Sequence, residues 1–380
     1  MNVRPSVSLC TYTYNDGAFV PGLLESAAAW SVRPDEIVIV DDGSEPAFAF
    51  DRLPDSARIV RLDPNRGFAA AKGTGLSAAR GDLLFSLDCD MRPDPDWLAI
   101  CLAHARDPSV GLVGGAVTYG SGRDVVSRWL ALFGDNHNLS VIGPVEFIPG
   151  NAFLLRRAVF EAVGGFSGFG EPVCEDHELC RRIRQQGLTL YSDARARAVQ
   201  IRRLHRTVLC RRIWLWCHKP VKARLPGRDL VAPYLFEVLA RPMLERIETA
   251  VERGEPLFLY LELLYLAHAV LDVLAFAASR GLVSEAARAG FAARLWAMLA
   301  GRPRVAAFLA ADLARIGHDL APSLPADAAA WDDFFLFADL FAQGGLLAWL
   351  EAEGLSLLAR EDMEEEFDFS TYGTKRFEVG

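Results

Sequence analysis

The feature that most constrains the fold is a regular alternation of short apolar runs and helix-like segments over the first 200 residues. Strand-like and helix-like segments follow one another at 6–12, 19–30, 36–40, 57–62, 67–81 and 82–87. This order predicts right-handed strand–helix–strand units and an α/β sheet. In such sheets ligands bind beyond the carboxyl ends of the strands, so a functional site is expected there.

The amino-acid composition of the chain changes after about residue 230. Leu, Ala and Phe dominate, β-branched runs disappear, and 284–301 and 332–354 have helical spacing of apolar residues. We therefore expect an α/β domain over 1–225, an all-helical domain over 230–360 and a solvated acidic tail over 361–380.

The segment 256–280 is long and apolar enough to raise the question of a membrane span. It carries Glu262, His268 and Asp272. Each acid would cost about 2.5–3.5 kcal/mol at the centre of a spanning helix. We therefore expect a buried helix of a bundle instead.

Composition bounds the class of protein. The formal charge is −9, from 40 basic and 49 acidic residues, which argues against a general nucleic-acid binder but leaves room for a local basic site. The seven cysteines include no Cys-x-x-Cys pair, and the first ten residues have no apolar signal-peptide region. These features predict a reduced, cytoplasmic environment.

Acidic pairs follow two of the predicted strands. Asp41 and Asp42 end the run 36–40, and Asp88 and Asp90 end the run 82–87. Asp88 and Asp90 share one face of an extended chain, whereas Cys89 points to the other face and is expected to pack. Their oxygens would suit Mg²⁺ or Mn²⁺. An isolated Asp-x-Asp is more often a pair of solvated loop acids, so the pattern alone is a weak metal signal.

Five segments occur in an order that resembles glycosyltransferase family 2, with the GT-A nucleotide-sugar fold. This order makes a functional reading of the Asp-x-Asp pattern stronger. The segments are "TYTYND", "IVIVDDGS", "NRGFAAAKGTGLSAARGDLLFSLDCD", "GNAFLLRRAVFEAVGGF" and "EDHELCRRIRQQG". The resemblance runs from about residue 6 to 210 and implies a Rossmann-like, mostly parallel sheet. It does not cover the helical C-terminal third.

The resemblance implies an inverting glycosyltransferase that moves a sugar from a nucleotide-sugar, UDP-linked, to a hydroxyl of a glycan, a lipid-linked or another acceptor. A divalent cation, Mn²⁺ or Mg²⁺, would neutralise the charge that builds on the leaving diphosphate. The family's motif assigns this metal to Asp90, and it assigns Asp88 to the ribose or the metal shell.

The resemblance also implies a nucleotide pocket. Asp41 matches the position that recognises the base, and Asp42 lies beside it in "DDGS". Tyr12 and Tyr14 match residues of the first strand that line the base pocket. Ordinary strand packing is the alternative for both tyrosines.

Further positions are implied near the donor. Gly150 and Asn151 match the sugar site, although a simple turn explains them equally well. Where the family usually has Arg-Asn, this chain has Lys72 and Gly73. Lys72 keeps the positive charge but loses the bidentate fork of Arg, which puts the choice of nucleotide in question.

The residues expected to act on the acceptor lie in "EDHEL", residues 175–179. Asp176 matches the family's catalytic base, and Glu175 is its acidic neighbour. A carboxylate in that position can take the acceptor proton as the hydroxyl attacks. The alternative is that both acids stabilise the start of the helix that follows. His205 matches a further metal ligand, with a solvated or structural histidine as the alternative.

The segment 202–228 is basic, with nine Lys or Arg residues, no acid, and Trp214 and Trp216. It could bind a diphosphate, or lie against an anionic membrane surface that carries a lipid-linked acceptor at the inner face. Pairing with the acidic tail is the third interpretation.

Two rival functions remain open on the sequence alone. A nucleotidyltransferase of the same fold would form a sugar nucleotide and release pyrophosphate. A non-catalytic binding or assembly protein would use the helical domain as its working surface.

Overall fold

The computed structural model describes residues 4–119, 124–133, 140–166, 175–223, 235–318 and 345–363. Their contacts divide into two compact units: residues up to 123 with 130–203, and residues 124–129 with those from 204 onward. The change of unit at 203/204 lies before the boundary that we expected near 225–230. The predicted helical residues 332–344 and most of the expected acidic tail 361–380 lie outside the described residues.

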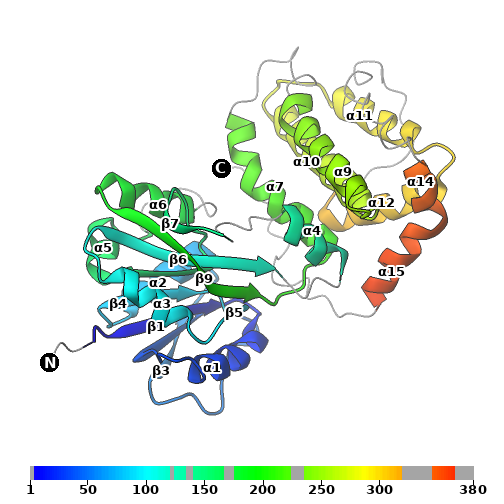
Figure 1. Cartoon of the computed structure of the whole chain (residues 1–380). Helices are drawn as coiled ribbons and strands as arrows, with labels where there is room; N and C mark the ends of the chain where they lie inside the picture. The colour runs from blue at the N-terminus through cyan, green and yellow to red at the C-terminus, as the bar shows by residue number, and fades with distance from the viewer. Residues whose placement is uncertain are drawn as a thin grey trace. The chain divides into compact units, whose positions relative to one another are not determined.

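The first unit is built on a nine-stranded mixed sheet within the described residues, in the order β3-β2-β1-β4-β8-β6-β9-β5, with β7 paired to β9 (Figure 1). The strands are β1 (Val7–Thr13), β2 (Glu36–Asp42), β3 (Ala57–Leu62), β4 (Leu83–Leu87), β5 (Met91–Pro93), β6 (Val110–Tyr119), β7 (Ile142–Val145), β8 (Ala152–Arg156) and β9 (Thr189–Gln200).

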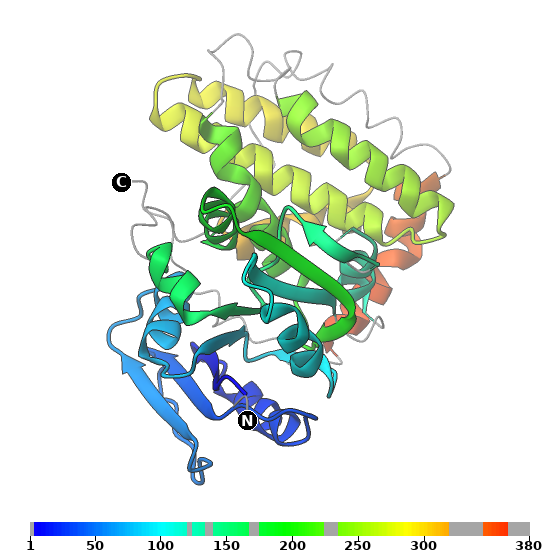
Figure 2. The ribbon, with the colours of Figure 1, turned by 60° about the vertical axis from the view of Figure 1, so that its left-hand side comes forward.

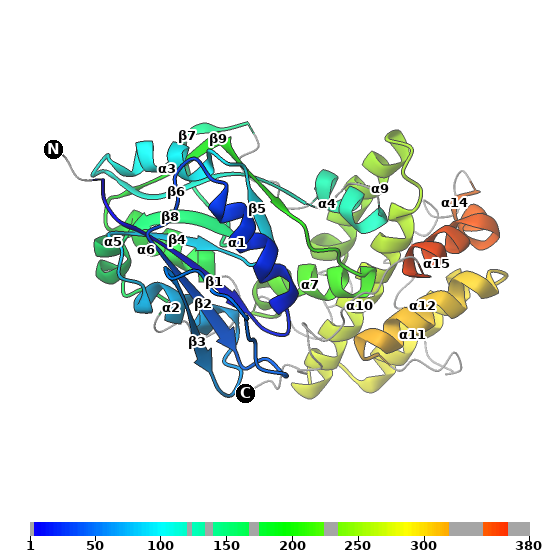
Figure 3. The same cartoon turned by 90° about the horizontal axis from the view of Figure 1, so that it is seen from below.

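Strands β3, β2, β1 and β4 form the parallel half of the sheet and lie side by side in Figure 3. Beyond β4 the sheet becomes mixed, because β8 pairs antiparallel with both β4 and β6, whereas β6 and β9 are parallel. Because β1 lies between β2 and β4, the carboxyl ends of these three strands are neighbours at one edge.

Helices cover both faces of the sheet and bury two apolar clusters. Cluster residues of α1 and α3 pack with Leu9, Ile39 and Phe85 on one face. Those of α2, α5 and α6 pack with Val38 and Leu84 on the other. The helical segments of this unit are η1 (Gly17–Phe19), α1 (Val20–Ala28), α2 (Phe68–Ala78), α3 (Trp97–Ala105), α5 (Arg157–Ala162) and α6 (Glu175–Gln185).

The second unit is helical throughout the residues described. Its elements are α7 (Arg206–Ala223), the π-helical η3 (Phe236–Ala240), α9 (Arg241–Glu252), α10 (Phe258–Ser279), α11 (Glu285–Met298), α12 (Pro303–Ile316), α14 (Leu346–Trp349), the π-helical η7 (Leu350–Gly354) and α15 (Leu355–Met363). The first residues of α4 (Val125–Phe133) also belong to it.

Helix α10 is the centre of this unit and contacts α7, α9, α11 and α12 (Figure 2). It is the one helix in the described part of the chain with the length and apolar composition of a membrane span, and 78% of its most apolar window is buried. Its Glu262 accepts hydrogen bonds from Trp129 and Arg246, and its Asp272 accepts one from Trp214. These partners agree with the expected buried bundle helix.

The predicted fold class is confirmed: a Rossmann-like α/β domain, with its first four sheet strands parallel, precedes a helical region. Each strand and helix expected in the first 87 residues is present, with ends shifted by a few residues.

Candidate active site

The candidate site lies at the carboxyl ends of β1, β2 and β4. Thr13, the last residue of β1, is in register with Asp41 of β2. Tyr12 is half-buried there, and the ammonium of Lys72 lies 5.6 Å from the centre of its ring. Burial, with nearby carboxylates led by Asp88, raises the pKa of Tyr12, so its hydroxyl stays protonated. Tyr14 follows the strand and is also half-buried.

The Asp88–Asp90 turn follows directly from β4, whose five residues are all buried. The Asp88 amide donates to the carbonyl of Asn151 at 2.9 Å, and the Met91 amide donates to the carbonyl of Asp88 at 3.0 Å. Cys89 is 4% exposed and packs in the apolar cluster under α1 and α3. The prediction that it packs is therefore confirmed.

Lys72 contacts several of the predicted site residues. It is buried on α2, and its ammonium donates to the carbonyl of Gly150 at 2.8 Å and to Glu175 at 3.1 Å. It also lies 3.7 Å from a carboxylate oxygen of Asp88. Burial lowers the pKa of Lys72, but the carboxylates of Asp88, Glu175 and Asp176 outweigh it, so the net shift is upward and the side chain is cationic.

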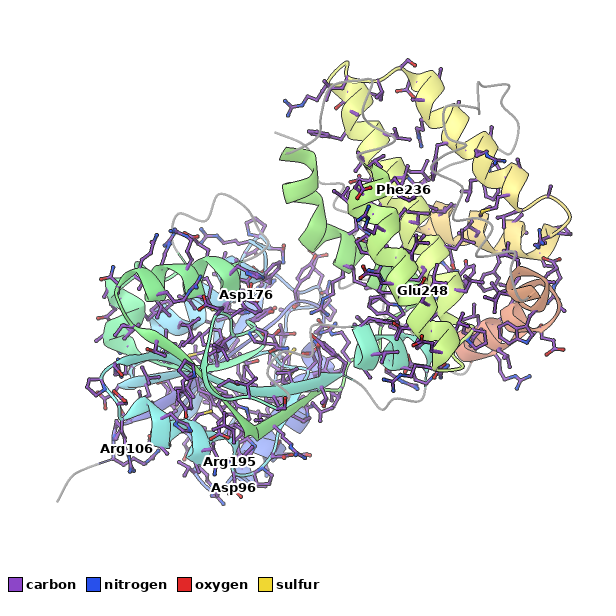
Figure 4. The ribbon with its side chains drawn as sticks, turned by 45° about the horizontal axis from the view of Figure 1, so that its top comes forward. Asp96, Arg106, Asp176, Arg195, Phe236 and Glu248 are labelled. Carbon is purple, nitrogen blue, oxygen red and sulfur yellow. The ribbon has the colours of Figure 1, made fainter. Side chains whose placement is uncertain are left out.

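The two acids at the start of α6 differ in their surroundings. Glu175 is buried, and burial raises its pKa although Lys72 opposes the shift. Asp176, labelled in Figure 4, is half-buried. Its Oδ2 accepts a 2.9 Å hydrogen bond from the amide of Gly150. Asp176 is therefore the member of the pair that an acceptor can approach.

Gly150 occupies a position where a side chain would be tightly packed. A Cβ there would lie 3.0 Å from the ammonium of Lys72, 3.1 Å from a carboxylate oxygen of Glu175 and 3.2 Å from Asp176. Its amide and carbonyl groups join the carboxylate of Asp176 to the ammonium of Lys72. A larger residue here would push on the charged groups, which would have to shift by a few tenths of an ångström.

The acids of β2 hold the loops that follow them. Asp41 accepts hydrogen bonds from the amides of Ser44 and Phe48 at 3.0 Å and from Arg61. Burial alone would raise the pKa of Asp41, but these hydrogen bonds outweigh it and lower the pKa. Asp41 is fully buried, so a nucleotide base could reach it only after the loop moves.

Asp42 has a comparable role at the start of α2. Its Oδ1 accepts from the Arg66 amide at 2.8 Å, and its Oδ2 accepts from the Gly67 amide at 2.9 Å and the Asn65 side chain at 2.8 Å. These bonds fix the chain that leads into the helix carrying Lys72.

Asp90 forms a hydrogen bond with the guanidinium of Arg202, a contact that the sequence analysis did not predict. Its Oδ2 accepts a 2.6 Å hydrogen bond from Arg202 and a 3.0 Å hydrogen bond from Gln200. Both outer nitrogens of Arg202 bind the carboxylate of Asp16, at 2.9 and 2.6 Å. The only sequence signals were that Asp16 ends "TYTYND" and that Arg202 opens the basic segment.

His205 lies in the second unit and is buried. Its Nδ1 is 2.7 Å from the hydroxyl of Thr207, and its Nε2 is 3.4 Å from a guanidinium nitrogen of Arg315. The backbone amide of Thr207 also donates to Nδ1 at 3.2 Å, so the roles of the two ring nitrogens depend on the tautomer of His205. A metal role for His205 stays a prediction, and it would require Arg315 to leave Nε2.

A divalent cation would find oxygen ligands at this edge of the sheet. Asp88 and Asp90 supply carboxylates, and the described chain offers no hydrogen bond to the buried side-chain oxygens of Asn151 and Gln200. No group of three or more His, Cys, Asp or Glu side chains among the described residues is arranged to hold a metal. Mg²⁺ and Mn²⁺ bind through few carboxylates plus substrate phosphates, so these residues fit a cation that a diphosphate helps to hold.

A separate groove of about 420 Å³ is lined in part by Asp96, His104 and Arg195. Figure 4 shows Asp96 and Arg195 close together and well apart from Asp176. The Nε2 of His104 donates to the carboxylate of the buried Asp193 at 2.8 Å. None of the predicted site residues lines this groove.

The basic segment 202–228 is not a uniform surface stripe. Arg202 binds Asp16 and Asp90, and Arg206 is 5% exposed and bound through two nitrogens to the buried Asp312. Trp214 is also buried. The side chains of residues 216–228, including Trp216, lie outside the described part of the structure.

Comparison with known proteins relates the first unit to a family. Residues 8–164 match the model of glycosyl transferase family 2. The pre-mycofactocin glycosyltransferase of Mycobacterium tuberculosis is 30% identical over 174 residues, which cover 42% of this chain and 36% of that protein. The glucosyl-dolichyl phosphate glucuronosyltransferase of Haloferax volcanii is 28% identical over 207 residues, covering 48% of this chain and 64% of that protein. The match thus spans less than two thirds of either relative.

Solved structures resemble the chain more weakly. The mannosyltransferase PcManGT of Pyrobaculum calidifontis, in complex with GDP-Man and Mn²⁺, is 18% identical with a TM-score of 0.43, covering 96% of this chain and 89% of that chain. GalNAc-T7 with UDP, GalNAc and Mn²⁺ is 16% identical with a TM-score of 0.45, covering 60% of this chain and 52% of that chain.

Proposed function

We propose that this chain, whose residues 8–164 match the model of glycosyl transferase family 2, transfers a sugar from a UDP-sugar to an acceptor hydroxyl with inversion at the anomeric carbon. Asp176 acts as the general base, and a divalent cation assists departure of the diphosphate. The relatives' printed names support the class of reaction.

The observation that carries the proposal is the charged cluster around Lys72. Asp88, at the end of β4, and Glu175, at the start of α6, both lie within 4 Å of its ammonium, and Gly150 links that ammonium to Asp176. The arrangement joins the donor-side carboxylate to the acceptor-side carboxylate. Clusters of this kind, with shifted pKa values, are typical of active sites.

On the donor side, Asp88 and Asp90 would hold the cation together with the diphosphate. When bound, the cation supplies positive charge that stabilises the departing nucleoside diphosphate. Tyr12 and Tyr14 border the same strand ends and offer aromatic surface to the nucleotide. Asn151 offers a buried amide oxygen beside the Asp88 turn.

On the acceptor side, the carboxylate of Asp176 takes the proton of the attacking hydroxyl. Gly150 donates to one of its oxygens, Oδ2, and orients the group. The buried pair of Glu175 and Lys72 acts as its support, because Glu175 is shielded from an incoming acceptor. A single displacement assisted by one base inverts the anomeric centre.

The acceptor is a glycan or a lipid-linked hydroxyl, and the chain works in the cytoplasm at the inner membrane face. A dolichyl phosphate-linked compound in the name of one relative supports the lipid-linked class. Because Arg202 and Arg206 pair with acids of the protein, membrane contact would rest on the other basic residues of 202–228.

Asp176→Asn tests the base. Transfer should fall by about 10²–10⁴-fold, the usual contribution of one general base, whereas UDP-sugar binding should stay close to that of the unchanged protein. Transfer can be followed by UDP release with a panel of donors, and binding by calorimetry. Glu178→Gln is the matched control, because Glu178 lies on the same helix and pairs with Arg181.

Normal turnover by Asp176→Asn would refute the assignment of the base. Pyrophosphate release from a nucleoside triphosphate and a sugar phosphate would show a nucleotidyltransferase in place of the proposed glycosyltransferase. Failure to bind or turn over any nucleotide-sugar, with the fold intact, would favour the assembly role.

A further inference from the structure

Asp90, the proposed metal carboxylate, already has a cation in contact with it. Asp90 is 3% exposed, and Arg202 donates through Nε to its Oδ2 at 2.6 Å. Gln200 donates to the same oxygen at 3.0 Å. A buried carboxylate needs such partners, because desolvating an unpaired charge is costly.

Arg202 is held from its other end as well. Its Nη1 and Nη2 donate to the two oxygens of Asp16, and its guanidinium carbon lies 5.0 Å from the ring centre of Phe19. The side chains of Arg202 and Asp16 are each 12% exposed. The bidentate pair with Asp16 would retain the guanidinium nearby if its Nε left Asp90.

A divalent cation and this guanidinium cannot share Asp90 without cost. Both are positive, and a metal bound to this carboxylate would lie a few ångströms from the guanidinium in a shielded environment. Like charges at that distance repel strongly where water is excluded. Metal binding must therefore either displace Arg202 from Oδ2 or proceed against its repulsion.

We propose that Arg202 is the resident counter-cation of Asp90 and competes with the divalent cation for that carboxylate. The inference rests on the proposed function, in which Asp90 binds the metal. Arg202 keeps the metal affinity of the free protein low. The diphosphate adds phosphate oxygens and negative charge, so the cation binds tightly only together with the nucleotide.

Titration of the full-length protein with Mn²⁺ alone tests the competition, with free Mn²⁺ measured by electron paramagnetic resonance. Arg202→Gln should lower the Kd for Mn²⁺ by at least about tenfold, because a close like charge is removed. Arg202→Lys keeps the charge and should retain weak binding. Arg197→Gln is the matched control, since Arg197 is exposed on the neighbouring strand β9.

A second variant guards against loss of folding. Arg202→Gln leaves Asp16 and Asp90 without their shared partner, so Asp16→Asn/Arg202→Gln removes one carboxylate and keeps Asp90. This double variant should show the same tightening of Mn²⁺ binding. Unchanged or weaker Mn²⁺ binding in both variants, relative to Arg197→Gln, would overturn the inference.

Asp90→Asn in the Arg202→Gln background separates this inference from the proposed function. Loss of the tightened Mn²⁺ binding supports competition at Asp90. Tight Mn²⁺ binding that survives Asp90→Asn would contradict the metal role of Asp90, and the competition with it. Mn²⁺ binding that depends on Asp90 but not on Arg202 would leave the function standing and refute the competition alone.

Discussion

Lys72 balances the charges of the site. Its ammonium is buried, with Glu175 at 3.1 Å and Asp88 at 3.7 Å. Breaking a buried ion pair from one side leaves a desolvated charge, which costs far more than the net worth of the pair. A Cβ at Gly150 would lie 3.0 Å from the Lys72 ammonium and 3.1 Å from a Glu175 oxygen, so a side chain there would press on the pair.

Lys72→Met should lower the free energy of unfolding by about 3–5 kcal/mol, because it keeps the volume of the side chain and strands Glu175. Urea denaturation measures the loss. Lys72→Met/Glu175→Gln is the control, and it should recover most of the stability because no buried charge is left without its partner. A double variant as unstable as the single one would mean that Lys72 acts through packing instead.

At the residue scale the sequence could locate acids but not their partners. Alternation along the strand predicted that Cys89 packs, and burial at 4% confirms it. The contact of Arg202 with Asp90 joins positions more than 100 residues apart, and no local pattern encodes it. The loop-holding role of Asp41 depends on Arg61 of the neighbouring strand, which is likewise a tertiary contact.

At the element scale, a histidine pair links α10 to the end of α12. The Nδ1 of His268 lies 2.8 Å from the Nε2 of His318. Burial lowers the pKa of His318 to about 4, against an ordinary value of 6.5, with Asp272 opposing the shift and Arg288 and Arg211 adding to it. Native His318 therefore resists protonation that the unfolded chain accepts.

The consequence is a loss of stability on acidification. The unfolded chain binds a proton at His318 below about pH 6.5, and the native chain does so only near pH 4, so stability falls as the pH drops through this window. Between about pH 7 and pH 5, the unchanged protein should lose about 2 kcal/mol more than His318→Gln in urea unfolding. His177→Gln, an exposed histidine on α6, is the control. If the unchanged protein and His318→Gln lost the same amount of stability between pH 7 and pH 5, this role of His318 would be excluded.

Periodicity predicted the elements that bury one clear face. The segments 36–40 and 67–81 became β2 and α2 with small changes at their ends, because their apolar residues face the two clusters. Short strands such as β5 and β7 escaped prediction, because three or four residues carry too little pattern. Their existence depends on pairing with β9, far along the chain.

At the scale of the whole molecule, charge argues for a metal in donor binding. The chain carries a formal charge of −9, and a nucleoside diphosphate is itself anionic. Two described cations of the candidate site, Lys72 and Arg202, are already bound to carboxylates. Under the proposed function, an added divalent cation would supply the positive charge that an incoming diphosphate needs.

UDP should accordingly stabilise the folded chain only when Mn²⁺ is present. A ligand that binds the native state adds about 2.7 kcal/mol at 100 times its Kd, so scanning calorimetry with saturating UDP and Mn²⁺ should show a clear rise in Tm. A chelator, or Asp90→Asn, should remove that rise in Tm. Arg197→Gln should keep it, because Arg197 is exposed on β9 and has no proposed part in binding the metal. An equal rise with UDP and chelator would mean that the chain's own cations bind the diphosphate without a metal.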